Sequence, residues 1–114
     1  MDKDYRELTA HERGLLEKLL DHEFEGRDDL LIQMASLTVK QVDVWGGLAL
    51  RANDQSFAKV LSRTPVEASC SDSDGVPIFA MLHVVKGKMV ALDIFKADGS
   101  NIVRPITAEE MKVY

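Results

Sequence analysis

Residues 77–96 read PIFAMLHVVKGKMVALDIFK, and this stretch decides the fold. Lys86-Gly87 divides it into two apolar runs that are rich in strand-forming residues. The first run is apolar on both faces apart from His83, which is typical of a central strand. The second is apolar on both faces except for Asp93, so this aspartate is expected near a sheet edge or at a site.

Turn-forming residues separate further runs of strand-like sequence on either side of this hairpin. Trp45-Gly46-Gly47 predicts a tight connection, and Asp, Ser and Gly at 71–75 and 97–100 predict two more turns. Residues 53–63 are ambiguous and allow one or two helical turns. Six strands are expected at most, over residues 38–44, 48–52, 66–70, 77–85, 88–95 and 102–106.

Two helices are expected before the strands. Thr9 and Glu12 have the spacing of a capping box, and leucines at helical spacing follow, so a helix is predicted from about residue 10 to 24. Asp28 is the expected cap of a second, shorter helix. The inward-facing residues predicted for this second helix are Leu30, Leu31, Met34 and Leu37.

These elements predict an α+β fold with two N-terminal helices packed on one face of an antiparallel meander of five or six strands. A chain of 114 residues has the length of one domain, and we expect residues 1–114 to form it. No apolar run approaches the roughly 20 residues of a membrane helix. The N-terminal residues do not resemble a signal peptide, so we expect a cytoplasmic protein that binds no membrane.

The charge is distributed unevenly along the chain. Residues 1–29 hold ten acidic and five basic residues and so carry the whole net charge of −5. Nucleic acid is therefore not an expected partner, because it requires clustered Lys and Arg. An acidic surface would attract a basic protein, although solvation of a helix face would explain the same charges. The candidate contact residues are Glu17, Asp21, Glu23, Glu25, Asp28 and Asp29.

The motifs of common catalytic and metal sites are absent from the sequence. Cys70 is the one cysteine, and we expect it to be a small buried residue without catalytic reactivity. His11 and His22 are too far apart on one helix, about 16 Å along its axis, to hold a single metal ion. Asp72-Ser73-Asp74-Gly75 resembles part of a calcium loop, but the ligands needed at its first and last positions are missing. We predict no cofactor, no metal and no catalytic residue.

Several stretches resemble a family of small bacterial single-domain proteins of unknown function. They are residues 6–12, 65–68, 72–78, 82–89 and 92–100. The pattern of the terminal hairpin is also similar to that of immunity proteins, which neutralise bacterial polymorphic toxins. The resemblance implies a compact α+β domain and supplies no catalytic residue. Asp93 departs from the glutamate expected at its position in the sheet.

Three functional hypotheses follow from these observations. The first is a protein-binding domain without enzymatic activity, in its most specific form an immunity-type antidote to a basic toxin. The second is a small-molecule-binding protein or minor enzyme with a pocket near Trp45, His83 and Asp93. The third is a homodimeric structural module that associates through an exposed sheet edge or apolar face.

Overall fold

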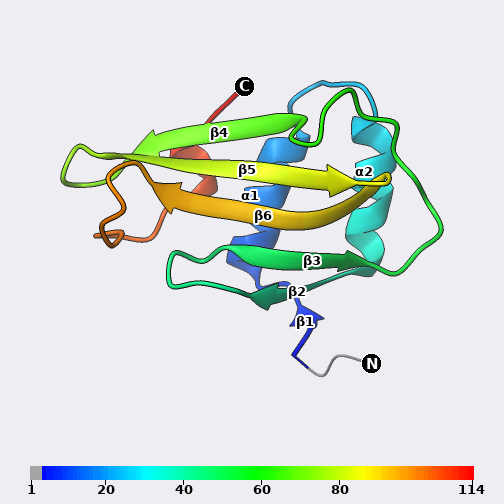
Figure 1. The fold of residues 1–114 in the computed structure, drawn as a ribbon, viewed down its shortest axis with the longest axis horizontal. Coiled ribbons are helices and arrows are strands. Elements are labelled where there is room, and N and C mark those ends of the chain that lie inside the picture. Colours follow the sequence, from blue (N-terminus) through cyan, green and yellow to red (C-terminus); the bar gives the residue numbers. More distant parts are fainter. Residues whose placement is uncertain (1–3) are drawn as a thin grey trace.

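A computed structural model describes residues 4–114 of the chain, in which two α-helices cross behind one antiparallel sheet (Figure 1). The expected α+β class is confirmed. The strands are β1 (Arg6–Glu7), β2 (Leu37–Gln41), β3 (Leu48–Ala52), β4 (Val66–Ser71), β5 (Pro77–Val85), β6 (Lys88–Lys96) and β7 (Lys112–Val113). The helices are α1 (Ala10–Leu20) and α2 (Arg27–Gln33), with 3-10 turns η1 (Met34–Ser36) and η2 (Ala108–Glu110).

The number of strands expected, five or six, is wrong: the sheet of the described residues has seven, in the order β1-β2-β3-β6-β5-β4-β7. The two additional strands, β1 and β7, have only two residues each and are too short to produce a periodic pattern. The strand expected over residues 102–106 does not form. There the amides of Val103 and Arg104 donate to the Asp72 carboxylate, and Pro105 has no amide to donate.

The sheet is also not a simple meander. Strands β4, β5 and β6 follow one another as hairpins, but β3 pairs with β6 instead of β4, with Leu48 opposite Leu92. Strand β6 is central and therefore requires a partner at both of its edges. Residues 53–65 connect β3 to β4: they pass the β5–β6 turn and reach the other side of the β5–β6 hairpin, where β4 begins (Figure 1).

Both helices differ from their expected bounds at one end. The capping box of Thr9 and Glu12 starts α1 as predicted, but the helix ends at Leu20 and not near residue 24. Helix α2 is capped by Gly26, not by Asp28, which lies in the first helical turn. Leu31 was expected to face inward, but it is 41% exposed. Residues 53–63 form no helix.

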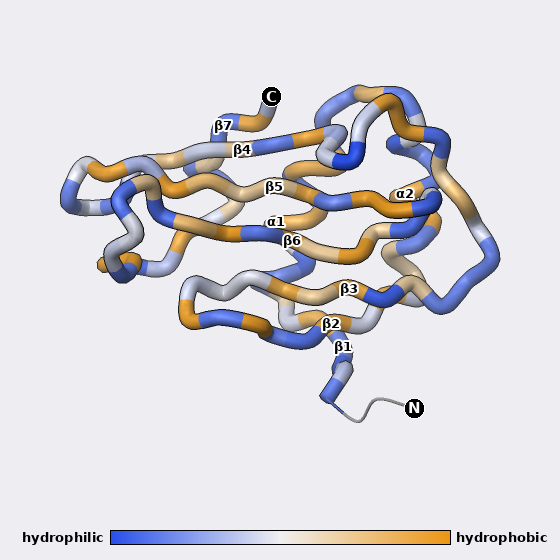
Figure 2. The backbone as a smooth tube through the Cα atoms, in the orientation of Figure 1, coloured by the Kyte–Doolittle hydropathy of each residue, from blue (hydrophilic) through white to orange (hydrophobic). Residues whose placement is uncertain are grey.

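The core lies between the helices and the covered face of the sheet. Alternate residues of β5 face it, and α1 contributes four buried leucines. Figure 2 shows apolar positions along both elements. The core residues on α1 and β5 are Leu15, Leu16, Leu19, Leu20, Ile78, Ala80, Leu82 and Val84. No helix of residues 4–114 covers the opposite face of the sheet (Figure 1), and there Phe79 and Phe95 lie with ring centroids 5.3 Å apart.

One fully buried polar residue, Gln33, joins α2 to the β5–β6 turn. Its Nε2 donates to the Gly87 carbonyl at 2.7 Å, and its Oε1 accepts from the Met89 amide at 3.0 Å. A buried backbone group that loses a partner is costly. Gln33 donates the second hydrogen bond to the Gly87 carbonyl, which also accepts from the Ala58 amide, and it accepts from the Met89 amide.

Replacing Gln33 by leucine is therefore expected to lower the free energy of unfolding by about 2–4 kcal/mol, measured by urea denaturation. Leucine fills a similar volume but leaves the Gly87 carbonyl and the Met89 amide without this partner. Gln55 is exposed, so Gln55→Leu serves as the control and is expected to change little. Equal midpoints for the two variants would show that the hydrogen bonds of Gln33 contribute nothing.

A second buried polar cluster fastens residues 101–104 to the β4–β5 turn. The Lys96 ammonium has no exposed surface and lies 3.0 Å from a carboxylate oxygen of Asp72, and it also pairs with Asp74. It donates to the Asn101 carbonyl at 3.0 Å. Asp72 in turn accepts from the amide of Val103 at 2.7 Å. The turn aspartates therefore hold a lysine ammonium, a role that the sequence pattern did not indicate.

This cluster makes stability depend on pH. Burial raises the pKa of the Asp72 carboxyl, but the hydrogen bonds from the Val103 amide, from Lys96 and from neighbouring amides outweigh burial and hold the pKa well below its usual range. A depressed carboxyl pKa stabilises the fold fully above about pH 5, and that contribution is lost as the pH falls toward the folded-state pKa. Asp72→Asn should therefore make the free energy of unfolding depend less on pH below about 5, as measured by circular dichroism in acid. The same pH dependence in the variant and the native chain would contradict this.

Candidate functional site

Six acidic residues gather where α1 ends and α2 begins, and we call them the acidic surface. Its members are Glu17, Asp21, Glu23, Glu25, Asp28 and Asp29, and all six are exposed. They come from the last turns of α1, the connecting loop and the first turn of α2. The fold therefore leaves every predicted contact residue of this set accessible to a partner.

Few ion pairs neutralise the acidic surface. Asp28 pairs with Arg27 at 2.9 Å, whereas the other five members form no ion pair within residues 4–114. The Arg27 guanidinium also donates to the Leu20 carbonyl, which keeps it at the end of α1. Most of the negative charge thus faces solvent, where it can act on an approaching cation.

A glycine holds the loop of the acidic surface against a distant part of the chain. Gly26 has a φ of 92°, in the left-handed region that glycine adopts at little cost. A Cβ at this position would lie 2.6 Å from the Lys59 carbonyl oxygen and 2.9 Å from a methyl of Val60. The acidic loop therefore packs directly on residues 59–60, which is the reason that a side chain is excluded here.

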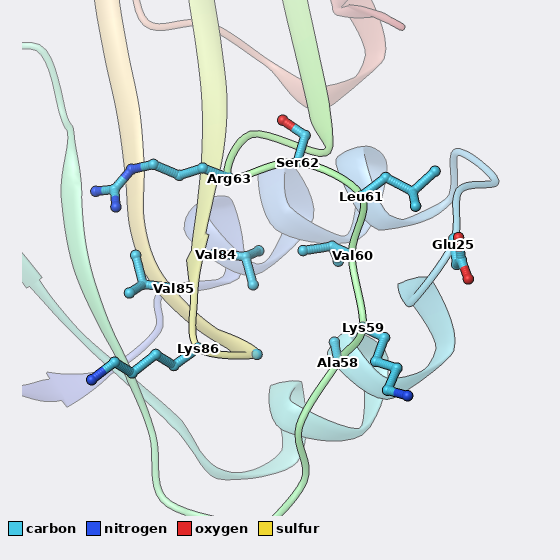
Figure 3. Close-up of a pocket in the computed structure, with 11 residues that line it drawn as sticks. Glu25, Ala58, Lys59, Val60, Leu61, Ser62, Arg63, Val84, Val85 and Lys86 are labelled. Atoms are coloured by element: carbon cyan, nitrogen blue, oxygen red, sulfur yellow. The ribbon is translucent and has the colours of Figure 1, made fainter.

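Next to this contact lies an open cavity of about 650 Å³ between residues 58–63 and the β5–β6 turn (Figure 3). Val60 and Val84 face each other across it, with Ala58 nearby. Glu25 of the acidic surface stands at one edge, beside Leu61, which is 86% exposed. The cavity therefore combines an apolar floor with an acidic edge.

Backbone hydrogen bonds tie the cavity wall to the sheet. The Val84 amide donates to the Arg63 carbonyl at 2.7 Å, and the Ala58 amide donates to the Gly87 carbonyl at 2.9 Å. Residues 58–63 are thus held at both ends although they form no helix or strand. Such a wall is preformed, which reduces the ordering cost of binding.

Three basic residues also line the cavity but do not form an anion site. In Figure 3 the Arg63 and Lys86 side chains extend toward one side of the cavity, while Lys59 extends to the other. Because the three side chains do not converge, no single anion could contact all of them. The feature that the lining offers a partner is therefore its apolar floor, which suits an apolar side chain.

The structure brings together two of the three residues of the expected small-molecule pocket. His83 Nε2 lies 3.7 Å from an Asp93 carboxylate oxygen on the uncovered sheet face, a separation longer than a hydrogen bond. His83 Nδ1 is buried and has no hydrogen-bond partner. Trp45 lies in another cleft, beside α1, and its indole donates to the Ser100 carbonyl at 3.1 Å.

Burial raises the pKa of the Cys70 thiol, in the direction of lower reactivity. Residues 4–114 contain no cluster of three His, Cys, Asp or Glu side chains that could hold a metal ion. Within the same residues, no helix has both the length and the apolar character needed to cross a membrane.

The cavity wall was not anticipated from the sequence, although the acidic surface was. The sequence of residues 53–63 was ambiguous and allowed one or two helical turns. Residues 58–63 are instead positioned by their contact with Gly26 and with the β5–β6 turn. Phe57 and Leu61 on or beside this wall are 65% and 86% exposed.

Comparison with known proteins identifies the family. The family described as "Domain of unknown function (DUF6984)" matches residues 5–106. The chain belongs to this family. The match confirms the expected membership in a family of small domains of unknown function. The residues that match DUF6984 include the acidic surface, the cavity and the whole hairpin of β5 and β6. No curated protein and no solved structure matches the chain.

Proposed function

We propose that this DUF6984 domain is a protein-binding module that acts by covering a basic surface of its partner and not by catalysis. The observation that carries the proposal is the acidic surface, with six exposed carboxylates of which five have no ion pair within residues 4–114. Charge of this kind accelerates the encounter with a positively charged protein and is screened by salt.

The cavity of Figure 3 supplies the apolar part of the same contact. Protein interfaces gain most of their affinity from a few buried anchors surrounded by polar contacts. Val60 and Val84 provide an apolar floor, and Glu25 stands beside it. A partner that offers an apolar side chain for the cavity and Lys or Arg for the neighbouring acidic surface would satisfy both features at once.

In its most specific form, the proposal is an immunity-type antidote that occludes a basic toxin. The support for this form is the small size of the chain, its local negative charge and the resemblance of its terminal hairpin to immunity proteins. Co-expression with the captured partner tests it, because an antidote should restore growth of cells that the partner alone arrests. Unrelieved growth arrest would remove the antidote form and leave the binding proposal in place.

The binding proposal is tested by capturing partners with the tagged chain and with two matched variants. One variant removes three charges of the acidic surface, Glu23→Gln, Glu25→Gln and Asp29→Asn. The other makes the same change in net charge elsewhere, at the exposed residues Glu7, Asp93 and Glu109. Lysate of the cells that encode the chain is applied at low and at moderate salt, and retained proteins are quantified by mass spectrometry.

We expect a stoichiometric basic protein that is retained by the native chain and by the second variant but lost from the first. It should also be lost from the native chain as salt rises, because exposed charge pairs are screened. An equal loss from both variants would show that net charge, not the acidic surface, determines binding, and native-level retention by both would contradict the proposal. Retention of acidic proteins alone would contradict the proposal.

A further inference from the structure

A second cleft lies on the helix side of the sheet, and we call it the Trp45 cleft. It has a volume of about 350 Å³ and lies between the start of α1, the β2–β3 loop and residues 102–106. Its apolar wall includes the buried side chains of Leu15, Ile94 and Ile106. Volume and lining fall within the range of small-molecule sites in proteins. It is separate from the cavity of Figure 3, since the two share no lining residue.

Hydrogen bonds within the chain hold the walls of the Trp45 cleft in place. The Asp43 carboxylate accepts from the amides of Trp45 and Gly47 at 2.9 and 3.0 Å, which shapes the β2–β3 loop. The Trp45 indole is held by the Ser100 carbonyl at 3.1 Å. Residues 103–104 are held by the Asp72 carboxylate. The cleft is therefore largely preformed.

The charged side chains at the cleft are already paired within the chain. Glu12 receives two hydrogen bonds from Arg6, at 2.7 and 2.8 Å. Arg104 donates to both carboxylate oxygens of Glu110, at 3.2 and 2.8 Å. A charged ligand would have to compete with these pairs, whereas a neutral one would leave them intact.

Two large apolar side chains remain uncovered among the lining residues of the cleft. Val44 is 83% exposed and Val103 is 62% exposed, on two of the segments that form its walls. An apolar molecule that covers apolar surface of this lining removes it from water, and such burial favours binding.

From these observations we propose that the Trp45 cleft binds a small, neutral, apolar molecule of up to three rings. The proposal does not depend on the protein-binding function, because the residues involved are different. Trp45 is the single tryptophan of the chain, so its fluorescence reports on this cleft alone.

The test uses N-phenyl-1-naphthylamine, a neutral apolar compound whose fluorescence rises in apolar surroundings. We expect saturable binding of one probe per chain, with quenching of Trp45 emission over the same concentration range. Val103→Glu places a carboxylate in the cleft lining without disturbing the core, and it should weaken binding roughly tenfold. The control is Leu61→Glu, which introduces the same charge at the other cavity and should leave probe affinity unchanged.

Two results would overturn the assignment. Fluorescence that rises without saturation, or without quenching of Trp45, would show that the probe does not occupy this cleft. Loss of binding in Leu61→Glu and not in Val103→Glu would place the probe in the cavity of Figure 3 instead. Neither result bears on capture of a basic partner, so the two proposals can fail separately.

Discussion

Replacing Lys96 by methionine is expected to lower the midpoint of thermal unfolding by more than about 10 °C, because it leaves buried carboxylate charge without its partner. The Lys96 side chain is fully buried and pairs with both Asp72 and Asp74. Methionine keeps the length of the side chain but removes the ammonium, and it also removes the donor to the Asn101 carbonyl. Differential scanning calorimetry measures the midpoint directly.

Two further variants show whether the charge is responsible. Lys112 is exposed on β7, and Lys112→Met is expected to leave the midpoint nearly unchanged. Adding Asp72→Asn to Lys96→Met should recover part of the loss, because the unpaired carboxylate is then neutral. A midpoint for Lys96→Met equal to that of the native chain would contradict a stabilising role for this cluster.

Replacing Gly26 by alanine is expected to lower the free energy of unfolding by about 2–4 kcal/mol. Two effects add at this position. Alanine is strained at a φ of 92°, and its Cβ would lie 2.6 Å from the Lys59 carbonyl oxygen. Relief of this contact requires the acidic loop to move away from residues 59–60. Urea denaturation measures the loss of stability.

The matched control is Gly75→Ala in the β4–β5 turn. Gly75 has a similar φ of 84°, but no atom lies within 4 Å of the position of its Cβ. This variant carries the conformational strain alone and is expected to cost about 1–2 kcal/mol. Equal losses for the two variants would mean that the packing of Gly26 on Lys59 adds nothing, and the acidic loop would then be free to shift.

The parts of the fold that follow from local sequence were predicted correctly. The capping box of Thr9 and Glu12 starts α1, and the two apolar runs around Lys86-Gly87 form the central hairpin of β5 and β6. In both cases the residues that determine the structure lie within a few positions of one another. A local sequence pattern is sufficient here because the residues that form the pattern also make the contacts that determine the structure.

The errors in the fold arose where the determining contact is distant in sequence. Strand β3 pairs with β6 across a separation of more than forty residues, and no local pattern indicates this order. Strands β1 and β7 form only because β2 and β4 offer edges for pairing. Residues 102–106 had the composition of a strand, but Asp72 takes two of their amides.

The same distinction applies to the candidate site. The acidic residues could be identified because they are concentrated in residues 1–29, and a helix end with a loop leaves them exposed. The cavity beside Glu25 could not be predicted, since Val60 and Val84 meet only through the tertiary fold (Figure 3). Pairing between β5 and β6 likewise brought His83 and Asp93 together but left Trp45 at another cleft.

The most direct test of the proposed function is the association rate of the captured basic partner, measured by stopped-flow fluorescence at low and at moderate salt. For the native chain the rate should fall steeply with salt. The variant that lacks the charges of Glu23, Glu25 and Asp29 should associate roughly tenfold more slowly at low salt and with a weaker salt dependence. The control with Glu7, Asp93 and Glu109 neutralised should associate close to the native rate. Identical rates and salt dependence for the native chain and the first variant would contradict a role for the acidic surface in binding.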